Sequence, residues 1–254
     1  VVQAITRSGR VTSYMLDERG KGLRTLGGDI INFAPSATKE IFIPAIPHTV
    51  KKVGTKLVEL PHSLRLLVPG EIDARVSVKV LSTDGTFIPA GLENKMVKAG
   101  SVVSLDLNPK LPNSKFGIQI SSNEPLVASV FSSTLAEGKS DFIWSTAVPA
   151  LTKFSLATTG IAPQLIFIGA AITAEAQLFF NNGERKKVVI NGSEIATLKV
   201  PDGVRSVTFT RVGKGIYGAG LVATKSGYGY FPLVAGSVLT KSSVPRSNIR
   251  VLSP

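Results

Sequence analysis

The chain contains no cysteine, and several other reactive residue types are scarce. Its 254 residues include two His, one Trp and two Met. Without Cys the protein has no disulfide, no thiolate ligand for a metal and no thiol nucleophile. The absence of disulfides is compatible with export from a bacterium, but it does not demonstrate export.

Long apolar runs are missing as well. No run approaches the roughly 18 residues that a helix needs to cross a bilayer, so we expect no transmembrane segment. The chain opens on Val1, Val2 and Gln3 without a Met. We interpret it as cut from a longer precursor, whose targeting signal would then be out of view.

Acidic residues are few, with 17 Asp and Glu against 29 Lys and Arg. The excess is uneven, because residues 1–150 carry 17 basic and 13 acidic side chains, whereas residues 151–254 carry 12 and 4. A basic surface favours polyanions such as acidic wall polymers. The alternative is a dispersed solubility charge, since the densest run is only Arg185-Lys186-Lys187.

Aromatic residues in the basic half suggest one candidate site. Tyr217, Tyr228 and Tyr230 follow one another near its end. Exposed aromatic rings beside Lys or Arg can stack on sugar rings or bases. Together with Arg185, Lys186 and Lys187 they form a candidate polymer-binding site. The competing interpretation is that these tyrosines are core and edge residues of a closing hairpin.

Alternation of apolar and polar residues is the dominant pattern of the sequence. It predicts strands with one dry and one wet face, which is typical of antiparallel sheets in a sandwich. We therefore predict an all-β fold of tandem, immunoglobulin-like β-sandwich modules. The clearest runs are 38–43, 74–80, 102–107, 116–120 and 204–209.

Turn signals separate these runs. Asp84-Gly85, Asn182-Gly183 and Asp202-Gly203 can supply the positive φ that tight turns need. Residues 170–180 resemble a short helix in composition, but they run directly into Asn182-Gly183 and are better interpreted as a hairpin arm. The sequence predicts no sustained helix.

Two stretches of the chain resemble each other weakly. Leu66 to Gly70, a strand from Ala74 and an Asp-Gly turn are matched by Leu165 to Gly169, a strand from Thr173 and an Asn-Gly turn. We therefore divide the chain into three parts. Residues 1–50 would hold the closing strands of a preceding module and a connection, residues 51–150 a first complete sandwich, and residues 151–254 a second, more basic one.

Nine segments of the chain follow one another in a characteristic order. They are Ser8 to Tyr14, Asp17 to Arg19, Gly27 to Ile31, Ile41 to Pro47, Leu64 to Gly70, Asp73-Ala74, Phe87 to Ala90, Ala99 to Val102 and Glu124 to Ala128. Together they resemble one known family, the secreted actinobacterial proteins grouped as domain of unknown function 5719. The resemblance implies export, association with the cell envelope and a location outside an actinobacterial cell, but it supplies no catalytic or binding residue.

The search for chemistry yields no catalytic apparatus. His48 and His62 each neighbour a proline outside any zinc-binding spacing, and we expect solvated loop residues, with a pH switch near 6.5 as the alternative. The Gly-x-Ser-x-Gly elbow of serine hydrolases is absent. A carboxylate pair for glycoside hydrolysis assembles in three dimensions, so spacing does not test it. Gly215 to Gly220 lies in a strand-like run, where its glycines indicate close backbone approach or bulges.

We therefore expect a non-catalytic envelope module, structural or interacting, without cofactor, metal or nucleic acid. Trp144 is expected in the core or between modules. Partners would be cell-wall polysaccharide or another envelope protein. The rival function is binding of anionic or carbohydrate wall polymers through the basic C-terminal half, and an enzyme is the third alternative.

Overall fold

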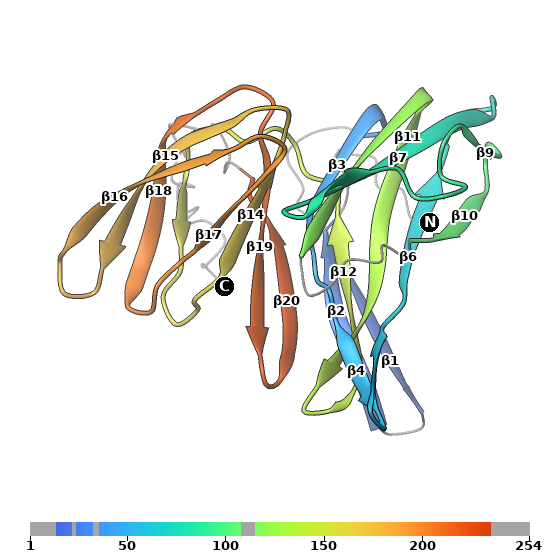
Figure 1. The fold of residues 1–254 in the computed structure, drawn as a ribbon. Helices are drawn as coiled ribbons and strands as arrows, with labels where there is room; N and C mark the ends of the chain where they lie inside the picture. The colour runs from blue at the N-terminus through green and yellow to red at the C-terminus, as the bar shows by residue number, and fades with distance from the viewer. Residues whose placement is uncertain (1–13, 22–23, 33–35, 108–114, 235–254) are drawn as a thin grey trace, which may run out of the picture.

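The computed structural model describes residues 14–21, 24–32, 36–107 and 115–234, and every regular element within them is a β-strand. The strands form antiparallel sheets, which confirms the predicted all-β sandwich class. None of these residues forms a helix that could cross a membrane. Figure 1 shows two sandwiches side by side, the first in blue to green and the second in yellow to red.

The first sandwich shares one long strand between its two sheets. Sheet 1a has the order β10-β6-β11-β12, and sheet 1b has the order β3-β11-β7-β8, with β9 also paired to β7. The first part of β11 pairs with β3 and β7, and its second part pairs with β6 and β12. Its strands are β3 (Thr38–Ile46), β6 (His62–Leu67), β7 (Ala74–Ser82), β8 (Gly85–Phe87), β9 (Lys95–Val97), β10 (Val102–Asp106), β11 (Phe116–Ala136) and β12 (Lys139–Thr146).

The second sandwich has two four-stranded sheets in the corresponding order. Sheet 2a runs β17-β14-β19-β20 and sheet 2b runs β13-β18-β15-β16. Here β18 and β19 take the places of the two parts of β11, and they are separated by residues 213–216, with Gly215 at φ 66°. The strands are β13 (Ser155–Ala157), β14 (Gln164–Ile168), β15 (Ile172–Phe180), β16 (Arg185–Gly192), β17 (Ile195–Lys199), β18 (Val204–Val212), β19 (Tyr217–Thr224) and β20 (Gly227–Pro232).

Two hairpins stand outside these sheets. One pairs β1 (Tyr14–Lys21) with β2 (Arg24–Asn32) and packs over β12 of the first sandwich. The other pairs β4 (Val50–Val53) with β5 (Lys56–Glu59) and is exposed along most of its length.

The expected boundary at residue 50 differs from the structure. β3 is a full member of sheet 1b, so the first sandwich begins at Thr38. The physical reason is its apolar content, because Ile41, Ile43 and Ile46 belong to the core of the first sandwich. Residues 1–13, on which the idea of a preceding module also depended, lie outside the described residues.

Alternation and turn chemistry determine the local structure as predicted. Along β7 and β15, every second residue is buried over most of the strand. The turns beside them hold Gly85 at φ 133° and Gly183 at φ 88°, a region that glycine reaches without steric cost. Residues 172–180 form β15, so the hairpin-arm interpretation is confirmed and the helix alternative is not realised.

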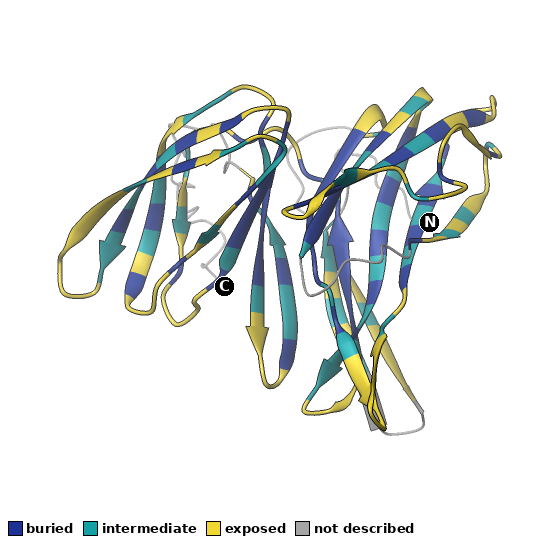
Figure 2. Ribbon diagram, in the orientation of Figure 1, coloured by how far each residue is buried: buried dark blue, intermediate teal, exposed yellow. Residues whose placement is uncertain are grey.

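Sheet 2a packs its outer face against the first sandwich, and we call this contact the junction. Ile166, Ala219 and Leu221 of sheet 2a form one apolar cluster with Ala45 and Ile143. As a result, β14 is buried on both faces along most of its length, and β19 is buried on both faces from Gly218 to Leu221 (Figure 2). A second cluster joins Phe42, Leu81 and Ile168.

Candidate functional site

The histidine expectation was wrong for both residues, because neither is a solvated loop side chain. His62 is 4% exposed, and its Nδ1 lies 2.9 Å from the Ser132 hydroxyl. Burial lowers the pKa of His62 to about 4, with a smaller contribution from His48. The His48 side chain is also buried, with Nε2 3.6 Å from a Glu59 carboxylate oxygen. Pro47 follows β3 where the chain leaves sheet 1b, and Pro61 precedes β6 where it enters sheet 1a, but neither proline keeps the neighbouring ring in water.

The structure places the three candidate tyrosines in the junction. The ring of Tyr217 stacks on Phe42 with 3.7 Å between centroids. Tyr230 is 9% exposed and donates a hydrogen bond from its hydroxyl to the Thr146 carbonyl, at 2.7 Å. Tyr228 packs partly buried against the same apolar cluster. These rings fill the space between the sandwiches and do not form an open platform.

Polar contacts complete the junction around these rings. The Lys79 ammonium lies 2.5 Å from Glu194, and the Thr86 hydroxyl also donates to Glu194. Lys115 donates to the Gln164 side chain. The charged pair is partly exposed, so we attribute more of the stability to the buried rings and aliphatic side chains.

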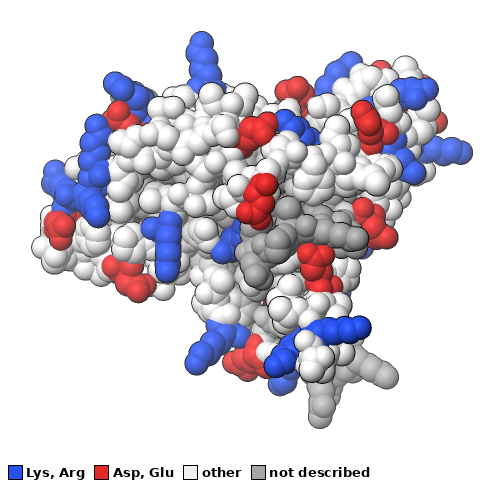
Figure 3. All heavy atoms as spheres, viewed as in Figure 1, with Lys and Arg blue, Asp and Glu red and all other residues white. Residues whose placement is uncertain are grey.

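The three candidate basic residues lie elsewhere, on β16 at the free edge of sheet 2b. Arg185, Lys186 and Lys187 are all exposed, and Figure 3 shows Lys and Arg side chains gathered over this end of the second sandwich. Lys187 pairs with Glu175 at 2.6 Å, and the Arg185 guanidinium lies 5.4 Å from the Phe179 ring centroid. The fold thus separates the basic residues from the tyrosines with which the sequence grouped them.

Trp144 is the anchor for the β1-β2 hairpin. Its indole Nε1 donates to Asp17 at 2.9 Å, and its backbone N donates to Asp29 at 2.6 Å. The Arg19 guanidinium covers the rings of Phe131 and Phe142 at 4.4 and 4.7 Å from their centroids. The expected structural role of Trp144 therefore extends to holding this hairpin on sheet 1a.

Burial acts differently on the two carboxyls that meet Trp144. For Asp17 burial opposes ionisation, but the hydrogen bonds from Trp144 and Arg19 outweigh it and lower the pKa. For Asp29 burial dominates over the backbone hydrogen bonds and raises the pKa to about 6. Arg65 adds a positive charge near Asp17. The described residues contain no group of three side chains arranged to hold a metal ion.

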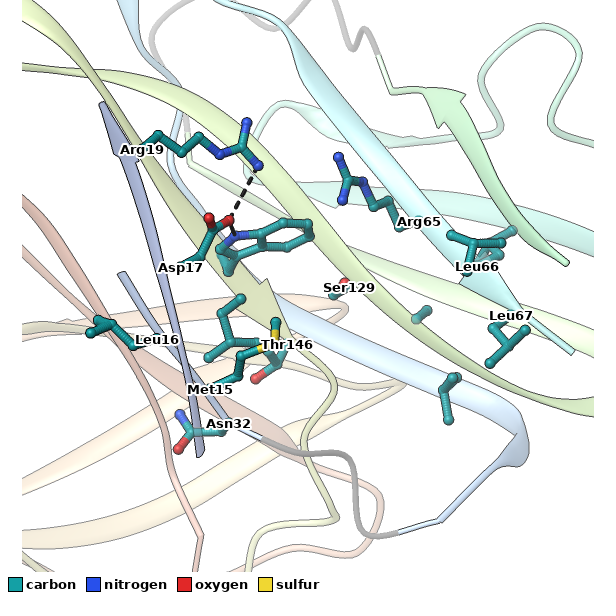
Figure 4. A pocket seen from close by; sticks show the side chains of 15 residues that line it. Met15, Leu16, Asp17, Arg19, Asn32, Arg65, Leu66, Leu67, Ser129 and Thr146 are labelled. Atoms are coloured by element: carbon teal, nitrogen blue, oxygen red, sulfur yellow. Dashed lines mark hydrogen bonds and ion pairs between the residues drawn. The ribbon is translucent and has the colours of Figure 1, made fainter. Parts of the chain in front are cut away.

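A groove of about 520 Å³ opens beside Trp144, between the hairpin and the outer face of sheet 1a. Figure 4 shows Arg19 and Asp17 on the hairpin side of the groove and Arg65 on the sheet side, with Leu67 further along β6. Most of its lining is apolar, including Met15, Leu16, Ile31, Leu67, Val102 and Val127.

Sequence reasoning missed this groove and its central cation. Arg65 stands among leucines in the run Leu64 to Leu67, and an Arg at the outward position of such a strand was the available signal. The hairpin that forms the other wall could not be placed without the contacts of Trp144, Asp17 and Asp29.

These features define a class, namely an all-β protein of two antiparallel sandwiches joined through a buried junction. The chain belongs to the family of unknown function DUF5719, whose model matches residues 1–178. That match spans the first sandwich and ends within β15 of the second.

Two further comparisons add little to this assignment. No curated protein matches the chain. A solved structure, "Crystal Structure of Thermotoga maritima 1070", is 16% identical and covers 44% of this chain and 93% of its own, with a TM-score of 0.37. A likeness at that level does not define the fold.

Proposed function

We propose that the protein is a non-catalytic, secreted or cell-surface module of an actinobacterial envelope, in which two sandwiches act as one rigid structural or interaction unit. The observation that carries the proposal is the junction. Its rings and aliphatic side chains are buried to a degree typical of a domain core, with Ile166 and Ala219 fully buried. Flexible pairs of domains are usually joined through smaller and more polar contacts.

The shared strand order of the two sandwiches supports the interpretation that the chain is a tandem of one module. An immunoglobulin-like origin of that module is part of the same proposal. A rod of such units keeps its shape without disulfides, and its loops and sheet edges are free for partners.

Rigidity can be measured directly because the chain has no Cys. Lys95→Cys on β9 and Asn182→Cys in the β15-β16 turn place spin labels on exposed positions of different sandwiches. One narrow distance distribution is expected for a fixed junction. A broad distribution would rule out a single rigid unit. Location is tested separately, by protease treatment of intact cells of the source organism, which should degrade the natural protein if it is surface-displayed.

We propose binding of anionic wall polymers as a second function, favoured by the exposed cations of sheet 2b. Arg205 and Arg211 add to Arg185, Lys186 and Lys187 on this sheet, and Glu175 contacts two of the five. Binding to poly(glycerol phosphate) should weaken steeply with added salt, since exposed charges are screened.

A matched pair of double variants tests the location of this binding. Arg185→Gln with Lys186→Gln removes two cations of sheet 2b, and Lys51→Gln with Lys52→Gln removes two from the exposed β4-β5 hairpin. Only the first variant should bind the polymer more weakly. Equal binding by wild type and both variants would contradict the assignment to sheet 2b.

A further inference from the structure

The outer face of sheet 1a has polar and apolar side chains sorted into rows. Strand register places Val102, Leu67 and Val127 directly beside one another on β10, β6 and β11. The next outward row is polar and consists of Ser104, Arg65, Ser129 and Thr146. The third outward row runs Asp106, Ser63, Phe131 and Trp144, so it is aromatic only on β11 and β12. The groove lies over the first two rows, next to the third.

Two buried polar atoms in the groove lining have no hydrogen-bond partner among the described residues. These are the Arg65 Nε and the Thr146 Oγ1, both in the polar row. Unsatisfied buried groups of this kind are energetically costly and rare in native proteins. Both atoms can donate to an oxygen acceptor brought in by a ligand.

The groove lining carries a net positive charge, which favours an anionic ligand. Its charged lining residues are Asp17, Arg19 and Arg65. Asp17 and Arg19 pair with each other at 3.2 Å. Within the described part of the chain, Arg65 makes no ion pair, and its guanidinium lies 4.9 Å from the Trp144 ring centroid.

The remaining surface of the groove is aliphatic. Val102 is 51% exposed on the floor, while Leu16 and Met15 are 56% and 43% exposed on the hairpin wall. Arg65 and Phe131 flank the indole of Trp144, and Trp144 is only 5% exposed. Its ring is therefore not available for a sugar to stack on. An extended hydrocarbon chain fits this surface better than a carbohydrate does.

We propose that this groove binds an amphipathic carboxylate of the fatty-acid type. The carboxylate accepts hydrogen bonds from the Arg65 guanidinium and the Thr146 hydroxyl, and the acyl chain lies along Val102, Leu67 and Val127 under Met15 and Leu16. The volume is within the range of small-molecule pockets. This site is separate from the junction and from sheet 2b.

The only Trp of the chain provides the measurement, because it borders the groove. Sodium decanoate, titrated below its micelle concentration, should shift the Trp144 emission in a saturable way. Acetate, which lacks the chain, and decyltrimethylammonium, which carries the opposite charge, should bind at least about tenfold more weakly, as expected when charge and chain both contribute. Equal binding of the cationic amphiphile, or saturation by a chitin oligosaccharide and not by decanoate, would overturn the proposal.

Two variants with matched controls locate the site. Arg65→Gln should weaken decanoate binding about tenfold or more, whereas Arg75→Gln, which removes an exposed Arg from sheet 1b, should not. Val102→Asp places a repelling charge in the groove, and Val189→Asp places it at a similarly exposed valine of β16.

Because Val102 is half exposed, its variant decides the matter even if Arg65→Gln does not fold. Decanoate binding that is the same in Val102→Asp and Val189→Asp would overturn the assignment. Weaker binding in Val102→Asp alone supports it.

Discussion

At the scale of single residues, burial gives two titratable groups opposite effects on stability. Unfolded His62 takes up a proton below its usual pKa of 6.5, whereas the folded residue resists protonation down to about pH 4. Stability therefore falls as the pH drops through this window. Unfolded Asp29 loses its proton above 3.8, whereas the folded residue keeps it up to about pH 6, so its contribution falls as the pH rises.

We predict that single substitutions separate these two effects. In Asp29→Asn only the His62 effect remains, so the free energy of unfolding should fall by up to about 3 kcal/mol between pH 6.5 and 4. In His62→Gln, stability should instead increase towards acid pH by about 1–2 kcal/mol, allowing for the partial exposure of Asp29. Urea unfolding across a pH series measures both slopes. Profiles identical to that of wild type in both variants would contradict the burial argument.

The Phe231 ring leaves no room for a side chain at Gly220 of β19. A Cβ on Gly220 would overlap this ring on the neighbouring strand, so the crowding comes from a side chain and not from the backbone approach expected for this run. We expect Gly220→Ala to lower the free energy of unfolding by about 1–3 kcal/mol, as overpacking does. Gly70→Ala is the matched control, because no described residue lies within 4 Å of its Cβ position, and it should be neutral within about 0.5 kcal/mol. Chemical denaturation distinguishes the two results.

At the scale of elements, the β1-β2 hairpin is one of two hairpins that stand outside the sandwich sheets. It forms a two-stranded sheet of its own and is held on β11 and β12 by side chains of Asp17, Arg19 and Asp29. Elements held by a few side-chain contacts open at lower free energy than central strands do.

We predict that Arg19→Ala loosens this hairpin selectively. The substitution removes the ion pair with Asp17 and the cation-π contacts with Phe131 and Phe142, at a cost of about 1 kcal/mol. Amide hydrogen exchange should become faster in β1 and β2 and stay unchanged in β15 and β18. Unchanged exchange in the hairpin would show that its docking depends on other contacts.

Elements were also where sequence reasoning succeeded best. The alternation in β7 and β15 and the Asp-Gly and Asn-Gly turns gave correct strands because these signals are local. It failed at Phe42 and Gly117, where the pattern predicts a wet face and the structure shows burial against the second sandwich. Which polar-patterned face becomes covered depends on how the two sandwiches pack together, and a short stretch of sequence holds no information about that contact.

At the scale of the whole molecule, the junction should make the two sandwiches unfold together. Buried apolar surface shared by two domains couples their unfolding, because exposing it costs free energy when either domain opens. Wild-type protein should therefore show one calorimetric transition.

We predict that Phe42→Ala uncouples the sandwiches. It removes the stack on Tyr217 and leaves a cavity in the junction, which should cost about 3 kcal/mol and split the calorimetric transition in two. Phe87→Ala is the control, since Phe87 on β8 is already 37% exposed and should leave a single transition. A single transition in Phe42→Ala, with only a lower midpoint, would show that other junction contacts are sufficient for coupling.

The sequence by itself determined the all-β class, most strand positions, the turns and the family, because period-two alternation and turn residues act over a few neighbouring positions. Only the tertiary structure decided that β3 joins the first sandwich, that Tyr217 and Tyr230 fill the junction, and that Arg65 faces an apolar groove. These outcomes depend on which surfaces meet after the strands have formed. Contacts between residues far apart in sequence, such as Phe42 with Tyr217 or Asp17 with Trp144, leave no periodic trace in the chain.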